Sequence, residues 1–362
     1  MSAWMTMTSR LALAALALAG TVGGKTGGPN YYSPEQLARA RQRCRDEAAA
    51  QRHVEGLREA VAGVMALTDE ALWRLVPPAE LVRATFLWQG AGNFPGCPVC
   101  GPEIFKAGGG FYPWVMRPDL PWKVTCPSCH TVFPSNDFAS FYERGMTGEC
   151  DRTGDFVDDG RGWVSPAGVR HYFVGHWGQK QRWMDILKAI DDLGELYRLT
   201  EEARYARTAA VLLCRLAQVY PAMEYARQSN YGALGRILPW CWENTSVVLP
   251  VAITYDNIWP WLRDLPDDGL RAFLMTQGIA DPCAHIDRGF LQDVAEKMIH
   301  TNQYLSNEGD HQRALAVVAV VWGDDDPAHG ITTAAMLEWL MRGRGSLESM
   351  VWNDLYADGF PN

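Results

Sequence analysis

The chain has little basic charge: 33 Lys and Arg residues stand against 42 Asp and Glu residues, for a formal net charge of -9. Proteins that bind nucleic acid over their surface need a basic footprint, so we expect no nucleic-acid partner. The sequence also lacks a Gly-x-Ser-x-Gly elbow, a phosphate-binding loop and a dinucleotide fingerprint, and we expect no organic cofactor. No fixed period of about 34 residues recurs, which argues against a repeat solenoid.

Long apolar runs are absent from the chain after its N-terminal segment. That segment itself has the pattern of a secretory leader. Arg10 precedes the apolar run Leu11–Ala19, and Ala17-Leu18-Ala19 is a small-x-small cleavage site. The run is too short to cross a bilayer comfortably. We therefore predict a signal peptide over residues 1–24, no membrane span after its cleavage, and a periplasmic or secreted protein. An uncleaved apolar leader is the alternative.

Four of the nine cysteines form two knuckles, CPVC at 97–100 and CPSC at 126–129, with 25 residues between them. Four thiolates with this spacing can close a tetrahedral metal site. Because a site of four thiolates leaves no position for water, it would be structural. We predict a structural Zn2+ on Cys97, Cys100, Cys126 and Cys129. Two disulfides are the alternative in an oxidising compartment, and His130 is an alternative ligand.

The pattern at the start of the mature chain is helical. Ser33 is a good N-cap, Pro34 suits a first turn and Gln36 occupies the capping-box position. These signals predict a helix from Glu35 to about Leu67. A short helix should follow, from Thr68 to about Leu75, before the Pro77-Pro78 pair ends it. We assign residues 30–87 to these N-terminal helices.

Residues 88–175 are rich in Gly, Pro and aromatics, which predicts short strands and loops around the knuckles. From Gln179 the i, i+3/i+4 spacing of apolar residues returns. Further helices are predicted over 201–220, 245–262, 267–279, 289–303, 310–321 and 332–342. The fold class is therefore mainly α: an (α/α) toroid of antiparallel helix hairpins over 176–362, with an inserted zinc-ribbon-like module of four cysteines.

The densest polar cluster runs from Thr301 to Arg313, where one predicted helix ends and the next begins. Helix N-termini offer free N–H groups and a positive dipole end, which suit an anionic ligand. If Asp310 caps the second helix, its next two residues lie in the first turn. The side chains suited to binding a sugar acid without a metal are Asn302, Tyr304, Asn307, His311 and Gln312. An ordinary capped interhelical loop is the alternative.

A second cluster combines Arg236, Trp240, Trp242, Glu243 and Asn244, and Tyr255 could reach the same cleft. Aromatic faces pack against sugar rings, and the chain holds 15 Trp. The cluster is therefore a candidate sugar-stacking subsite with an anchoring arginine. A helix terminus with interfacial tryptophans is the alternative. The net negative charge does not exclude an acidic polysaccharide or oligosaccharide substrate, because a local Arg/His cluster can hold one.

The run NEGDHQR at 307–313, followed by Gly323-Asp324, resembles the exported polysaccharide lyases of the heparinase II/III and alginate-lyase type. The resemblance covers roughly residues 180–362. The terminal DGFPN at 358–362 is similar to the start of that family's Asp-Gly-x-x-x-Glu-x-Ser-Pro-x-Tyr segment. The family implies an N-terminal (α/α) toroid followed by a β-sandwich domain. On this resemblance the chain is the N-terminal part of a longer enzyme, inactive alone, with its catalytic Tyr beyond Asn362.

The reaction that the resemblance implies is β-elimination at a uronic acid. The C5 proton becomes acidic only when fixed donors neutralise the neighbouring carboxylate and stabilise the enolate. A Tyr or His then removes the proton, and a Tyr protonates the leaving oxygen. By motif position the resemblance implies Asn307 and His311 on the carboxylate side, supported by Gln312 and Asn302. Arg236 is implied as a ligand for a neighbouring uronate.

Asp310 departs from the family pattern, because a carboxylate at this position would repel that of the substrate. Either Asp310 caps the helix, or the motif assignment is shifted by a residue or more. Two other functions also stay open. An (α/α) toroid glycoside hydrolase would need two carboxylates ~5–10 Å apart, for which the candidates are Glu243, Asp256, Glu308 and Asp310. A non-catalytic, exported, carbohydrate-binding helical scaffold would need neither set.

Overall fold

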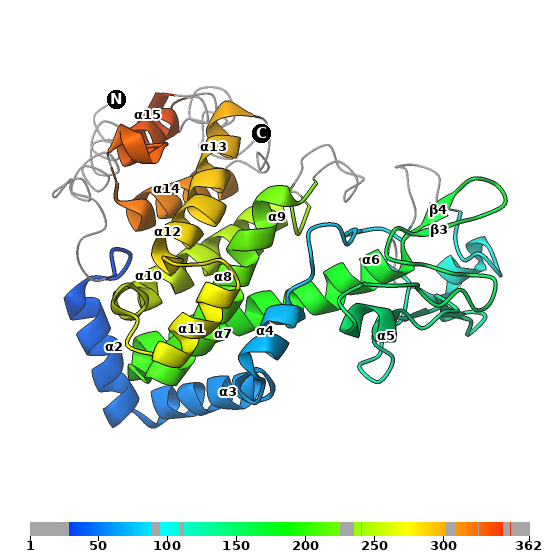
Figure 1. The fold of residues 1–362 in the computed structure, drawn as a ribbon, viewed down its shortest axis with the longest axis horizontal. Helices are drawn as coiled ribbons and strands as arrows, with labels where there is room; N and C mark the ends of the chain where they lie inside the picture. Colours follow the sequence, from blue (N-terminus) through cyan, green and yellow to red (C-terminus); the bar gives the residue numbers. More distant parts are fainter. Residues whose placement is uncertain are drawn as a thin grey trace, which may run out of the picture.

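The computed structural model describes residues 29–87, 95–108, 112–224, 235–239, 241–301, 309–324, 326–342 and 348. Within these ranges the protein is mainly helical, with two small two-stranded sheets (Figure 1). The leader predicted for residues 1–24 lies outside them. Among the described helices, none combines the length and the apolar character needed to cross a membrane.

The N-terminal part consists of α2 (Pro34–Asp46), α3 (Ala48–Met65) and α4 (Asp69–Leu75). The predicted capping box is confirmed, because Ser33 Oγ accepts from the backbone N–H of Gln36 and the Gln36 side chain accepts from that of Ser33. The prediction of one helix to about Leu67 is wrong. Glu47 is extended, with φ -108° and ψ 121°, and the break turns α3 away from α2 so that both pack against α7 (Figure 1).

The cysteine module has the short strands and loops that its composition predicts. Its elements are η1 (Pro102–Ala107), β1 (Val124–Thr125), β2 (Val132–Phe133), α5 (Phe138–Glu143), β3 (Trp163–Val164) and β4 (Arg170–His171). Both strand pairs are antiparallel, with Val124 opposite Phe133 and Trp163 opposite His171. The module has an aromatic core of its own, which includes Trp114, Trp122, Phe133, Phe138 and Phe173. It therefore buries its apolar residues separately from the helical core.

A continuous helix leads from this module into the helical array: α6 (Phe173–Trp177), the π-helical segment η2 (Gly178–Trp183) and α7 (Met184–Thr200) (Figure 1). The array continues with α8 (Ala203–Val219), η3 (Tyr220–Ala222), α9 (Cys241–Glu243), the π-helical η4 (Asn244–Val248), α10 (Leu249–Asp264), α11 (Asp268–Thr276), α12 (Pro282–Ile286), the π-helical η5 (Asp287–Gln292), α13 (Asp293–His300), α14 (Asp310–Trp322), η6 (Pro327–His329) and α15 (Thr333–Arg342). The helices predicted after Gln179 are present, with shifted ends.

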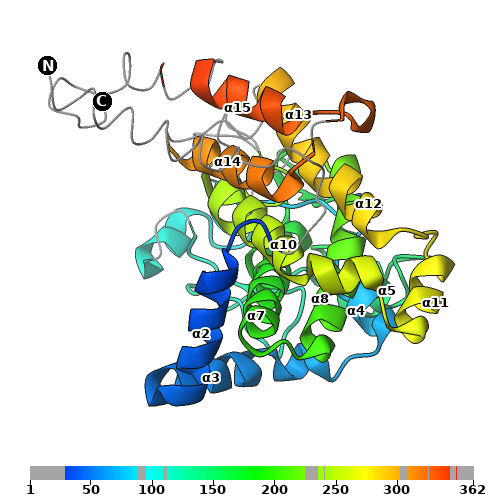
Figure 2. The ribbon, with the colours of Figure 1, turned by 90° about the vertical axis from the view of Figure 1, so that its left-hand side faces the viewer.

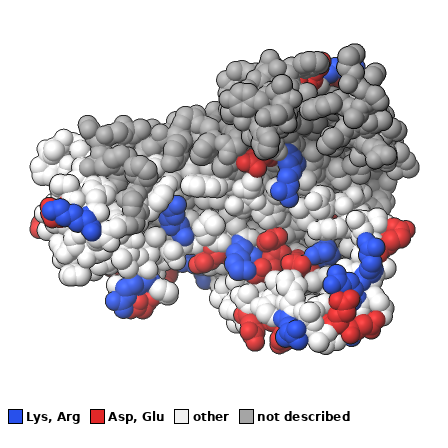
Figure 3. Space-filling view, turned by 180° about the vertical axis from the view of Figure 1, so that it is seen from behind, with Lys and Arg blue, Asp and Glu red and all other residues white. Residues whose placement is uncertain are grey.

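The main apolar core lies where α7, α8 and α10 pack together. Close approach of α7 and α10 depends on Gly194, because a Cβ there would lie 2.4 Å from Thr254 Oγ1. Figure 2 shows α14 and α15 at one end of the array and α2 and α3 at the other. On the face seen in Figure 3, acidic and basic side chains are interspersed over the described surface.

Candidate functional site

The four knuckle cysteines converge in the structure. Cys97 Sγ lies 3.7 Å from Cys129 Sγ, Cys100 Sγ lies 3.6 Å from Cys126 Sγ, and all four sulfurs lie within 4.8 Å of one another. A tetrahedron with Zn–S bonds of about 2.3 Å has edges of about 3.8 Å. A disulfide would require about 2.05 Å, and these four thiols are free. The cluster can therefore hold a metal ion.

Backbone hydrogen bonds shape the two knuckles. Cys97 N and O pair with Gly101 O and N at 2.9 and 2.8 Å, and Val99 N donates to Cys97 Sγ at 3.4 Å. In the second knuckle His130 N donates to Cys126 O at 2.9 Å, within the turn that joins β1 to β2. His130 itself is not in the group of converging ligand atoms, which consists of the four cysteines. The alternative of His130 as a ligand therefore has no support from the geometry.

The pKa values of the thiols differ. Burial raises the pKa of Cys97, and it raises that of Cys100 to about 11. Burial also acts to raise the pKa of Cys129, but hydrogen bonds with Thr131 and the neighbouring thiols outweigh it and lower that pKa to about 7. A divalent cation would convert such thiols to thiolates, because metal binding displaces their protons.

The second candidate site centres on Arg236, which is 2% exposed. Its Nη1 donates to three carbonyl oxygens that end α8 and η3, those of Tyr220, Pro221 and Met223, at 2.8, 2.6 and 2.9 Å. Its Nη2 lies 2.8–2.9 Å from the carboxylate of Asp293 at the start of α13. Backbone carbonyl oxygens therefore bind one terminal nitrogen of the guanidinium, and the Asp293 carboxylate binds the other.

Glu243 is completely buried beside this arginine segment. Its carboxylate accepts from Tyr220 Oη at 2.5 Å, Leu238 N at 2.6 Å and Ile237 N at 3.1 Å. Burial raises the pKa of Glu243, and these hydrogen bonds act against the rise. The turn must come close to the carboxylate, because a Cβ at Gly235 would lie 2.0 Å from Leu238 O. Glu243 therefore fixes the backbone of residues 236–238.

A second buried arginine, Arg83, connects the N-terminal part to this network. Its guanidinium donates to the carbonyl oxygens of Arg236 at 2.8 Å, Ala79 at 3.0 Å, Leu81 at 3.1 Å and Glu224 at 3.3 Å. Burial lowers the pKa of Arg83 to about 10. The buried polar network, defined as Arg83, Arg236, Glu243, Asp293 and Tyr220, thus joins two guanidiniums, two carboxylates and a phenol from distant parts of the chain.

In the described part of the chain, the π-helical segments η2, η4 and η5 all border this buried polar network. Gln179 in η2 donates through Nε2 to Ile237 O at 2.8 Å, Glu243 directly precedes η4, and Asp293 directly follows η5. π-helical turns are rare and occur frequently at functional sites. Gln179 and Asp293 could not be predicted from the sequence, because nothing near them shows that a π-turn directs them toward residues more than 50 positions away.

The side chains of Arg236 and Glu243 are both buried, and Glu243 binds the backbone of the two residues that follow Arg236. Tyr255 on α10 is buried too, and its hydroxyl donates to Cys283 O at 3.3 Å. In the first turn of α14, Gln312 Oε1 accepts from Gly309 N at 2.7 Å and His311 packs edge-on near Trp339, 6.3 Å between ring centroids. Gly309, rather than Asp310, is therefore the N-cap.

Four other predicted site residues lie outside the described ranges: Trp240, Asn302, Tyr304 and Asn307. Of the hydrolase candidates, Glu308 is also outside them. Asp256 is buried and accepts from Asn30 N at 3.0 Å and Tyr31 N at 2.8 Å. The catalytic and substrate-binding roles expected for all these residues stay predictions.

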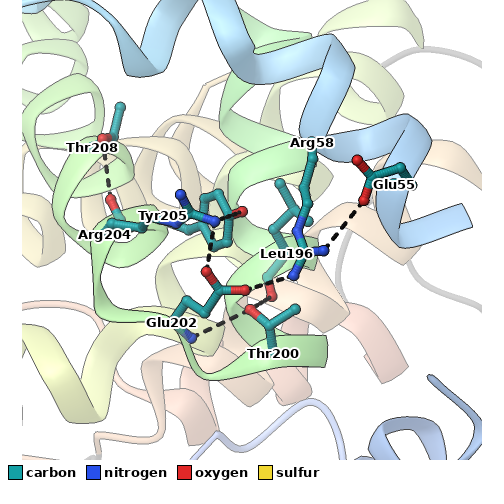
Figure 4. Close-up of polar contacts among 8 residues, drawn as sticks. All are labelled: Glu55, Arg58, Leu196, Thr200, Glu202, Arg204, Tyr205 and Thr208. Carbon is teal, nitrogen blue, oxygen red and sulfur yellow. Dashed lines mark hydrogen bonds and ion pairs between the residues drawn. The ribbon is translucent and has the colours of Figure 1, made fainter. Parts of the chain in front are cut away.

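A cavity of about 390 Å3 lies elsewhere, between α3 and the start of α8, and none of the predicted residues lines it. Two arginines line it, Arg58 and Arg204, and Glu202 binds both, at 2.8 and 2.7 Å (Figure 4). Because a carboxylate of the protein already bridges the two guanidiniums, this cavity offers an anion no free positive charge.

Comparison of the chain with protein-family models, curated proteins and solved structures found no match.

Proposed function

We propose that the protein is an exported lyase that cleaves a uronic-acid-containing polysaccharide by β-elimination, on an (α/α) toroid to which the described helices belong. Two residues link α7 to α8, so these helices form an antiparallel hairpin, and α10 packs against both. Such hairpins are the repeating unit of a toroid. The exported location rests on the leader-like residues 1–24.

The observation that carries the proposal is the position of His311. It lies in the first turn of the 13-residue helix α14, directly after the NEGD run of the lyase-like motif, and is 2% exposed. A helix N-terminus favours a carboxylate, and in this proposal the imidazole there becomes a donor to that carboxylate once the substrate reaches it. Neutralising the carboxylate is the step that makes the C5 proton removable, so His311 is assigned this role together with Asn307.

The cysteine cluster takes a structural role in this proposal. Its four sulfurs suit Zn2+ in number, type and spacing, and a site of four thiolates leaves no position for a reacting water. Bound zinc would supply cross-linking of the two knuckles and no chemistry.

The test is to incubate the full-length gene product with a panel of uronate polymers and to follow the ultraviolet absorbance of the unsaturated uronate that elimination creates. His311→Ala and His311→Gln should abolish the rise on the polymer that wild type cleaves. His53→Ala is the matched control, because His53 lies exposed on α3. Thermal unfolding of each variant separates loss of chemistry from loss of fold.

Absorbance that rises in wild type and in the His53 variant, but not in folded His311 variants, supports the proposal. New reducing ends without absorbance would refute it in favour of hydrolysis and move attention to the carboxylates. If neither absorbance nor new reducing ends appear with alginate-type and glycosaminoglycan-type polymers, catalysis would be refuted and the binding scaffold favoured.

A further inference from the structure

Lys180 carries an ammonium group without an anionic partner among the residues that the structure describes. It lies in η2 and is half-buried. Its Nζ lies 4.3 Å from the centroid of the Tyr112 ring and 5.5 Å from that of the Trp242 ring. Burial lowers the pKa of Lys180, and no neighbouring carboxylate acts to raise it. By contrast, Lys188, two turns later on the same helix, binds Asp192 at 2.6 Å.

The three side chains come from three different parts of the fold. Tyr112 belongs to the stretch between the two cysteine knuckles, and its ring stacks on Phe86 at 5.4 Å and 12°. Trp242 lies in α9 and is 37% exposed. Lys180 lies on the helix that runs from the cysteine module into the array (Figure 1). The cluster therefore marks the junction between module and array.

Two aromatic faces attract an ammonium, but they leave its charge and its three N–H donors uncompensated. A half-buried cation of this kind gains most from an anion that brings its own acceptor oxygens. A tryptophan with more than a third of its surface exposed offers, beside that cation, a flat apolar face for a sugar ring. The combination suits a ligand unit that carries one negative charge on a ring.

We propose that Lys180, Tyr112 and Trp242 form a binding subsite for one uronate unit of the polymer, with the sugar carboxylate on the Lys180 ammonium and the sugar ring against Trp242. This inference rests on the proposed function and adds to it a substrate contact. It also gives the cysteine module a direct task, because the module supplies the Tyr112 wall of the subsite.

The test measures binding apart from turnover, by isothermal titration calorimetry of the full-length protein. The probes are an unsulfated uronate tetrasaccharide, its carboxyl-reduced counterpart, and a sulfated neutral tetrasaccharide. Lys180→Met should weaken binding of the uronate about tenfold or more, to the level of the carboxyl-reduced probe, whereas Lys180→Arg should retain most of the affinity. Lys188→Met, on the same helix, is the matched control and should bind as wild type does.

Equal uronate affinity of wild type and Lys180→Met would overturn the subsite, as would equal affinity of wild type for the uronate and its carboxyl-reduced form. Binding of the sulfated neutral probe in preference to the uronate would overturn the carboxylate assignment. Uronate binding that depends on Lys180, without elimination, would support the subsite and refute the lyase. Elimination that is unaffected by Lys180→Met would refute the subsite alone, and absence of both binding and elimination would refute both.

Discussion

Replacing Arg236 by Met should destabilise the protein strongly, because the structure makes this arginine a buried structural cation. The side chain of Arg236 is 3% exposed and that of Asp293 is 13% exposed, so solvent screens their ion pair little. Removing the guanidinium leaves the Asp293 carboxylate without its partner and takes the donor from three carbonyl oxygens of the chain.

The expected loss follows from these contacts. Breaking a buried ion pair by removing one partner costs about 3–5 kcal/mol. Each carbonyl left without a donor adds up to about 1–3 kcal/mol where water cannot reach it. We therefore expect Arg236→Met to lower the free energy of unfolding by at least about 4 kcal/mol, a large part of the ~5–15 kcal/mol typical of a folded domain. Adding Asp293→Leu should recover part of this loss, since it removes the unpaired carboxylate.

Urea unfolding followed by circular dichroism measures the effect. The control is Arg263→Met, because Arg263 and Asp264 form an exposed ion pair, 47% and 64% exposed, of a kind that contributes little to stability. A loss in Arg236→Met no larger than in this control would refute the structural assignment. A stable Arg236→Met protein with a raised KM on a uronate polymer would instead restore Arg236 as a substrate ligand.

Three further results are expected. Cys126→Ser should lower the zinc content measured by mass spectrometry to well below one ion per chain and lower the thermal unfolding midpoint, and an unchanged metal content would contradict the assigned centre. Burial lowers the pKa of His176 to about 4, so the unfolded chain takes up a proton below its ordinary value of about 6.5 while the folded chain does not. The contribution of His176 to the free energy of unfolding should therefore be fully present above pH ~6.5 and be lost, by about 3 kcal/mol, as the pH falls toward ~4. In urea unfolding, the free energy of unfolding of His176→Gln should depend less on pH than that of wild type. Gly289→Ala should destabilise by more than about 1 kcal/mol in the same assay, because its Cβ would lie 2.3 Å from Ala217 O, whereas Gly63→Ala on the open side of α3 should be neutral or stabilise by ~0.5–1 kcal/mol.

Local signals in the sequence predicted the local parts of the structure. The capping box at Ser33 and the positions of the later helices depend on residues three to four apart, and both are present. The cysteine cluster is also predictable, because a knuckle brings two thiols together locally and only two knuckles have to meet. The break at Glu47 was not predictable, because the sequence there holds no Gly or Pro. The break at Glu47 occurs where α2 and α3 both pack on α7, a tertiary contact that the local sequence does not show.

The partners of the candidate site residues could not be read from the sequence. Arg236 and Asp293 are 57 residues apart, and the pairing depends on a π-turn that places Asp293 at the start of α13. Such a turn adds one residue to the helical period, so a 3.6-residue pattern assigns the residues around it to the wrong face. The sequence therefore did not show which side chains of this stretch face inward.

In the helices around the buried polar network, the orientation of a buried side chain determines that of its exposed neighbour. Successive residues of a helix point about 100° apart, so fixing one side chain in the interior determines where its neighbour projects. Glu243 is fixed by Tyr220 and two backbone N–H groups, and its neighbour Trp242 is exposed. Gln179 is fixed by Ile237 O, and its neighbour Lys180 lies between two aromatic rings. The buried polar network and the Gln179–Ile237 hydrogen bond beside it thus orient the two side chains that we propose bind the substrate. A variant that loosens either one should weaken uronate binding without removing a residue that contacts the ligand.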